Sequence, residues 1–204
     1  ALNRAIDTFM ENDYDSEQHR QLGELVERFH AIARQGMVRS ATNRRDRFIT
    51  QMADVVDETA AGEAARFVPF LESPYSGTEN PLAPSTSVRR DGQDVVARVH
   101  LGSALEGAPG RAHGGAIAAV FDDIMGAVQR VTGRPAYTRS LTVHYLAPFP
   151  ADREVTITAR EVECDDRAFT IEADAATGEG KVVARSTGTF TRVEVGRFAS
   201  TSGK

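Results

Sequence analysis

The chain has 204 residues, a formal net charge of −5 and 41% hydrophobic residues. That length suits one ordinary domain with an appended segment. The mildly acidic balance predicts no nucleic-acid partner, and no apolar run reaches the about 18 residues that predict a membrane span. Because the N-terminus also lacks a signal-peptide pattern, we expect a cytoplasmic protein with no membrane contact. One cysteine, Cys164, excludes an internal disulfide.

Two amphipathic helices are predicted near the N-terminus. Residues 16–36 carry apolar side chains at helical spacing, with Asp15 or Ser16 as the cap and Gly36 at the end. A second stripe predicts a helix from about Arg45 to Ala61. Isolated helices of this length are marginal in water, so both need a surface to pack on.

The composition changes after these helices, and the change sets the predicted boundaries. Residues 1–70 are expected to form an N-terminal helical extension, and residues 71–85, rich in proline and small polar residues, a linker. The main domain is expected over 86–195, where Val, Thr and Ile alternate, and 196–204 as a flexible tail.

Period-two alternation in the main domain predicts strands, with one long helix between them. The strands are expected over 94–102, 138–148, 153–164, 168–177 and 181–195, with a glycine-rich loop over 107–115 and a helix from about His113 to Val131. We expect the four strands after the helix to form a meander. One helix and five to six antiparallel strands indicate an α+β fold, with one sheet wrapped round a central helix.

The predicted helix has two unlike faces. One is an apolar stripe that must face the sheet, made of Ile117, Val120, Phe121, Ile124, Val128 and Val131. The other holds Ala118, Ala119, Asp122, Asp123 and Gly126, where a surface helix would carry long polar side chains. The two aspartates therefore face a partner subunit or a narrow cleft, with a solvated face as the alternative. Neighbouring helical residues point about 100° apart, so at most one acid is central to a site.

The start of this helix has its own chemistry. Its first backbone N–H groups lack partners and lie at the positive end of the helix dipole. Two successive glycines, Gly114 and Gly115, leave these amides accessible, which suits a developing oxyanion. A flexible helix entry is the alternative. Gly114 and Asp122 lie about 12 Å apart along the axis, so one carbonyl carbon cannot touch both. Two antiparallel copies of the helix would bring them together, which indicates a dimer.

The stretches "HGGAIAAVFDD" (113–123) and "TRSLTVHYLAPFP" (138–150) resemble the hotdog-fold acyl-CoA thioesterase superfamily, in its PaaI-like and THEM4-like branch. The resemblance covers roughly residues 84–195. It implies the hotdog fold and an enzyme that hydrolyses an acyl-CoA thioester to a free acid and coenzyme A, without a cofactor. It also implies a homodimer or a dimer of dimers with active sites at the subunit interface.

The resemblance implies a role for each matching residue. Asp122 matches the catalytic acid, as nucleophile or general base for water. The Gly114 amide polarises the thioester carbonyl, with Gly115 beside it; His113 helps to place the thioester, and Thr138 orients the water or the acid. Further contacts with the substrate are expected from Asp123, Ala118, Ala119, Arg139 and Ser140.

Other interpretations stay open at this stage. A hotdog enoyl-CoA hydratase or dehydratase would use a histidine, His113 or His144, and a non-catalytic acyl-CoA-binding module would use neither. Five histidines without a close pair predict no metal site. The N-terminal extension either covers the acyl end of the site or extends the subunit interface. The acyl group itself is not readable from the residues.

Overall fold

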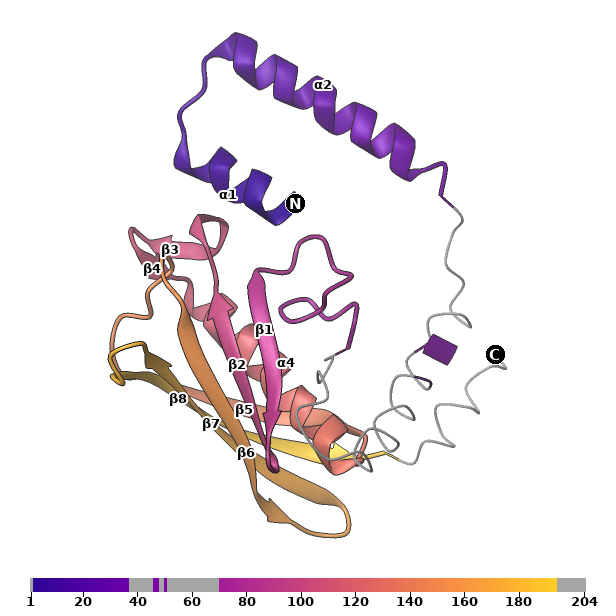
Figure 1. Cartoon of the computed structure of the whole chain (residues 1–204), viewed down its shortest axis with the longest axis vertical. Helices are drawn as coiled ribbons and strands as arrows, with labels where there is room; N and C mark the ends of the chain where they lie inside the picture. Colours follow the sequence, from indigo (N-terminus) through magenta and orange to yellow (C-terminus); the bar gives the residue numbers. More distant parts are fainter. Residues whose placement is uncertain (1, 37–45, 48–49, 51–69, 194–204) are drawn as a thin grey trace.

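The structure is a computed structural model that describes residues 2–36, 46–47, 50 and 70–193 (Figure 1). The helix predicted from about Arg45 to Ala61 lies almost wholly outside these residues, and the tail over 196–204 lies entirely outside them. Within the described residues, no helix is long and apolar enough to cross a membrane.

One antiparallel sheet of six strands forms most of the domain, in the order β1-β2-β6-β7-β8-β5. Its strands are β1 (Ser85–Asp91), β2 (Asp94–His100), β5 (Ala136–Tyr145), β6 (Val155–Cys164), β7 (Ala168–Thr177) and β8 (Val182–Arg192). The single helix α4 (Gly114–Thr132) packs against the sheet, with contacts to β2, β5, β6, β7 and β8 (Figure 1). The predicted α+β architecture is therefore confirmed.

The apolar stripe of α4 is the centre of the core. Val120, Phe121, Ile124 and Val128 have no exposed surface, and Ile117 is 3% exposed. They meet inward-facing side chains of the sheet, which include the stacked rings of Phe169 and Phe190 and the aliphatic groups of Val99, Ile157 and Ile171. The opposite face of α4, with Ala118, Ala119, Asp122, Asp123 and Gly126, is half-buried, as its composition predicts.

One expectation about the strands is wrong, and one strand is additional to those predicted. β5 does not start a meander: it pairs with β8 at the opposite edge from β1, and β2 pairs with β6. The segment Ser85–Asp91 is a strand in its own right, because Gly92 and Gln93 turn the chain back into β2, with Gly92 at a φ of 63°. Alternation shows that a strand exists, but it does not say which neighbour the strand pairs with.

Short elements occupy the loop before α4. They are the 3-10 turn η1 (Ser103–Leu105) and the two-stranded ladder of β3 (Glu106–Ala108) and β4 (Arg111–Ala112). His113 N–H donates to the carbonyl of Leu105 at 2.8 Å, so the loop is tied to the residue that begins the helix. The glycine-rich segment is thus less irregular than its composition predicts.

Two helices of the N-terminal extension are described. α2 (Ser16–Ala33) has the predicted cap: Asp15 accepts the Gln18 N–H at 2.8 Å, and Gln18 returns a bond to the Asp15 N–H. It ends three residues before the predicted Gly36 and buries no residue. α1 (Leu2–Glu11) was not predicted. The side chain of Asp7 holds it on η1 by accepting the Ala104 N–H at 3.1 Å.

Replacing Gly188 tests how tightly the core is packed. This buried glycine of β8 lies under α4, where an added Cβ would stand 2.8 Å from a ring carbon of Phe190 and 3.2 Å from the sulfur of Met125. We expect Gly188→Ala to lower the free energy of unfolding by about 1–3 kcal/mol, as overpacking does. Gly178→Ala, at a turn with nothing within 4 Å of the new methyl, is the matched control and should stay within about 0.5 kcal/mol. Equal denaturant midpoints for the two variants would contradict the packing described.

Candidate functional site

His113 fixes the first turn of α4. It is the N-cap residue, with φ −65° and ψ 136°, and its ring Nδ1 accepts the Gly115 N–H at 3.0 Å. A Cβ on Gly115 would lie 3.1 Å from that same Nδ1, so glycine keeps the cap uncrowded. The Gly115 N–H is therefore occupied by the helix cap. The neighbouring Gly114 N–H has no hydrogen-bond partner among the described residues.

Tyr145 approaches the same turn from the end of β5. Its hydroxyl donates to the carbonyl of Gly114 at 2.8 Å, and 53% of the residue is exposed. A Cβ on Gly114 would be 3.5 Å from the Tyr145 oxygen, which is an ordinary contact. The glycine amide and the tyrosine thus share one accessible surface. The sequence pattern did not assign a role to Tyr145, because strand alternation alone does not show what the end of a strand contacts.

Asp122 and Thr138 meet two turns further along α4. The Thr138 hydroxyl donates to Asp122 Oδ1 at 2.8 Å. A β-bulge lies here: Thr138 pairs with Phe190 and Ser140 with Thr189, which leaves Arg139 as the extra residue of β5. Bulges commonly redirect a side chain beside a functional site. Asp122 is half-buried and Thr138 is exposed, so the pair lies at the open edge of the sheet.

The amide end and the acid end of α4 are separate groups in one chain. Gly114 and Asp122 are about 12 Å apart along the helix axis, as eight residues require. Ala118 and Ala119 lie between them on the same half-buried face. Arg139 and Ser140 are exposed on β5, and their side chains make no hydrogen bond or ion pair with the described residues. The structure therefore brings Asp122 to Thr138 and leaves Gly114 apart from both.

Asp123 has a different set of partners. Its carboxylate accepts hydrogen bonds from the hydroxyl of Ser73 and from the Tyr75 N–H, the latter at 3.1 Å. Both donors come from the segment between the N-terminal extension and β1. Asp123 thus anchors that segment on α4, and its expected contact with substrate stays a prediction. A partner 50 residues away left no signal in the local pattern.

The histidines and other possible metal ligands form no metal-binding group around Asp122 in the described residues. His113 is exposed and uses Nδ1 in the helix cap, and His144 is exposed on β5. Neither ring contacts Asp122 through a hydrogen bond in the described part of the chain. Nor do three or more His, Cys, Asp or Glu side chains gather into a metal-binding group among those residues.

Replacing Asp123 tests its anchoring role. Asp123→Ala leaves the Ser73 hydroxyl and the Tyr75 amide without their acceptor, so we expect the free energy of unfolding to fall by about 1–3 kcal/mol. Limited proteolysis should also cut residues 70–84 faster than in the unaltered protein. Asp166→Ala, which removes an exposed carboxylate from a hairpin turn, is the matched control. An Asp123 variant as stable and as protease-resistant as this control would rule the anchor out.

Part of the chain is similar to known thioesterases. Residues 109–184 match the model of the Thioesterase superfamily. The human acyl-coenzyme A thioesterase THEM5 is similar to this chain, with 30% identity over 95 residues that cover 46% of this chain and 38% of that protein. The chain thus matches well under half the length of this relative.

Solved structures share the fold. A crystallised thioesterase superfamily protein is 25% identical, with coverage of 93% of this chain and 94% of that chain and a TM-score of 0.57. A hypothetical thioesterase from Streptococcus pneumoniae TIGR4, solved with coenzyme A, is 23% identical over 53% of this chain and 86% of that chain, with a TM-score of 0.51. PaaI from E. coli is 18% identical over 53% and 80% of the two chains, with a TM-score of 0.50. The sheet and helix α4 therefore form a hotdog fold, and residues 109–184 within it match the thioesterase superfamily.

Proposed function

We propose that this protein is an acyl-CoA thioesterase that hydrolyses a thioester to a free acid and coenzyme A. One observation carries the proposal: a single face of α4 presents the unpartnered Gly114 amide and the carboxylate of Asp122, held by Thr138. The human relative THEM5, an acyl-coenzyme A thioesterase, supports the substrate class, and the streptococcal protein with this fold was solved with coenzyme A. We propose the cytoplasm as the compartment.

The Gly114 amide would bind the thioester oxygen. As the carbonyl carbon becomes tetrahedral, negative charge develops on this oxygen, and the N–H group at the positive end of α4 stabilises it. Because the Gly115 amide already donates to His113, the donor is Gly114. His113 acts by holding the turn, and Tyr145 by bonding the Gly114 carbonyl. Ala118 and Ala119 leave room for the substrate along the helix.

Asp122 would supply the second half of the chemistry. Thr138 donates to Oδ1, which fixes the carboxylate and leaves Oδ2 for the reaction. As general base, Asp122 takes a proton from water while the water oxygen bonds to the carbonyl carbon and the thiolate of coenzyme A leaves. As nucleophile, it displaces the thiolate and forms an anhydride that water then hydrolyses. Both routes need one free carboxylate oxygen beside the thioester.

The two groups would meet across two subunits. Since about 12 Å separates them in one chain, the Gly114 of one subunit would face the Asp122 of its antiparallel partner. Among the described strands, β5 is an edge strand that pairs with β8 only, and an edge strand is where a second copy would dock. We therefore propose a homodimer, or a dimer of dimers, with composite sites. Arg139 and Ser140, exposed on β5, lie where they would reach the substrate or the partner.

Substitutions at Asp122 and Thr138 test the acid. We expect Asp122→Asn to lower kcat by about 10²–10⁴-fold, the usual contribution of a positioned acid or base. Thr138→Val removes only the hydroxyl donor and should cost less, and Thr138→Ser should restore most of the rate. Thiol release from aryl, short-chain and long-chain acyl-CoAs measures this, with circular dichroism as the folding control. A folded Asp122→Asn protein with unaltered kcat would refute the mechanism, and no thiol release from any substrate would favour a binding module.

Mixed dimers test the composite site. Gly114→Pro removes the amide donor, yet it suits the first helical position, and the extended ψ of 136° at His113 suits a residue before proline. We expect the Gly114→Pro variant by itself to have a kcat lowered by about 10²–10³-fold. Gly114→Ala keeps the N–H, so its kcat should fall less. Refolding Gly114→Pro together with Asp122→Ala should restore activity, because the mixed dimer holds one intact pair. Two inactive parents that give an inactive mixture, with mixed dimers verified by mass spectrometry, would argue for sites within one chain.

A further inference from the structure

Among the described residues, the N-terminal helix α1 is hydrogen-bonded to the main domain only at the turn η1. The main-chain carbonyl of Asp7 accepts the hydroxyl of Ser103 at 3.0 Å, and the Asp7 carboxylate accepts the Ala104 N–H at 3.1 Å. A charged acceptor makes a stronger hydrogen bond than a neutral one. Asp7 therefore carries the attachment of the helix to the domain.

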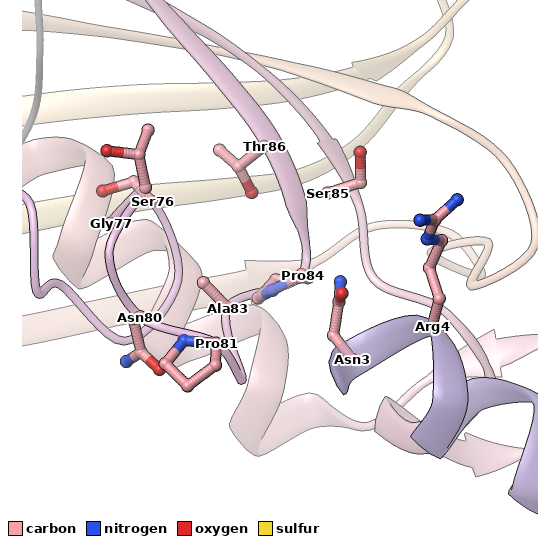
Figure 2. Close-up of a pocket in the computed structure, with 11 residues that line it drawn as sticks. Asn3, Arg4, Ser76, Gly77, Asn80, Pro81, Ala83, Pro84, Ser85 and Thr86 are labelled. Carbon is pink, nitrogen blue, oxygen red and sulfur yellow. The ribbon is translucent and has the colours of Figure 1, made fainter. Parts of the chain in front are cut away.

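A cavity of about 480 Å³ separates the first turn of α1 from the segment that leads into β1. Figure 2 shows Asn3 and Arg4 of α1 on one side of this space and Ser85 and Thr86 of β1 on the other. The first turn of α1 makes no hydrogen bond to this segment in the described part of the chain. The contact at η1 is thus the one through which α1 can influence the domain.

The residue before η1 is a glycine that leaves room for Asp7. Gly102 has a φ of 81°, and a Cβ on it would overlap the carboxylate of Asp7. Its own N–H donates to the carbonyl of Ala151 at 3.0 Å. The turn is therefore bonded to the domain on one side and to α1 on the other.

The turn η1 is bonded in turn to the start of α4. The carbonyl of Leu105, the last residue of η1, accepts the His113 N–H at 2.8 Å. His113 is the N-cap residue, and its Nδ1 accepts the Gly115 N–H at 3.0 Å. Three contacts in series therefore connect Asp7 to the helical turn that presents the Gly114 amide.

We propose that Asp7 is a positioning residue for the thioester chemistry, because it holds η1 and so fixes where the Gly114 amide lies. This inference rests on the proposed function, in which that amide binds the developing oxyanion. A donor of this kind acts only when it lies about 2.7–3.1 Å from the position that the oxyanion takes. Asp7 touches no substrate atom and acts through Leu105 and His113. The N-terminal helix thus serves the amide half of the site.

Kinetics of Asp7 variants test the proposal. Asp7→Ala removes the acceptor of the Ala104 N–H, so we expect kcat for thiol release to fall by about 10–100-fold, the effect of a small misplacement far from the chemistry. Asp7→Asn keeps an acceptor oxygen and should retain most of the rate. Glu11→Ala, which removes an exposed carboxylate at the end of the same helix, is the matched control. A kcat for Asp7→Ala equal to that of this control would overturn the proposal.

A double-mutant cycle shows whether Asp7 acts through the Gly114 amide. Gly114→Pro has no amide to position, so adding Asp7→Ala to it should lower kcat no further. Thr138→Val leaves the amide intact, so Asp7→Ala added to it should lower kcat by its full factor. A general weakening of the fold would instead lower kcat by the same factor in both backgrounds, and that result would contradict the proposal.

Hydrogen exchange gives a readout that needs no activity. Asp7→Ala should speed exchange of the His113 N–H, which donates to Leu105, because the turn that holds it is released. The Arg134 N–H, which donates to Gln129 at the other end of α4, should exchange as in the unaltered protein. Unchanged exchange at His113 would overturn the link from Asp7 to α4 even in an active enzyme. Absence of thiol release from the unaltered protein would instead count against the proposed function.

Discussion

The structure depends on the burial of one helix face in a sheet. Val120, Phe121 and Ile124 of α4 have no exposed surface, and burying each such side chain is worth about 1.5–3 kcal/mol. That constraint fixes which face of α4 remains for chemistry. Because both residues lie on one continuous helix, Gly114 and Asp122 stay about 12 Å apart along its axis, independent of the loop conformations. A site that needs both groups at one carbonyl must therefore take them from two helices.

The edge strand β5 gives this helix its functional positions. Near its start, a bulge at Arg139 directs Thr138 to Asp122, and at its end Tyr145 reaches the Gly114 carbonyl. One strand thus positions both ends of the open face of α4. Among the described strands, β5 pairs with β8 alone, and the free side of an edge strand is the usual place for a second chain to dock.

Periodicity along the sequence predicted the helices and strands well, but it predicted poorly which of them pair or pack together. The 3.6-residue period identified α4 and its buried stripe, and the family resemblance singled out Asp122, which Thr138 does contact. Alternation predicted β5 as a strand but placed it in a meander, because pairing depends on how the chain crosses the sheet. The bonds from Ser73 to Asp123 and from α1 to η1 join residues far apart in sequence. Such contacts are set by tertiary packing, which propensity and periodicity do not encode.

The paired aspartates show how one helix serves two purposes. Adjacent helical residues point about 100° apart, so Asp122 faces the edge strand while Asp123 faces the segment before β1. Among the described residues, the first carboxylate accepts one hydrogen bond, from Thr138, whereas the second accepts two, from the hydroxyl of Ser73 and the backbone amide of Tyr75. Identical side chains thus acquire different roles from their neighbours alone. The contacts of the second acid explain its place on the helix: without Asp123, the segment that contains Ser73 and Tyr75 would lose these two bonds to α4.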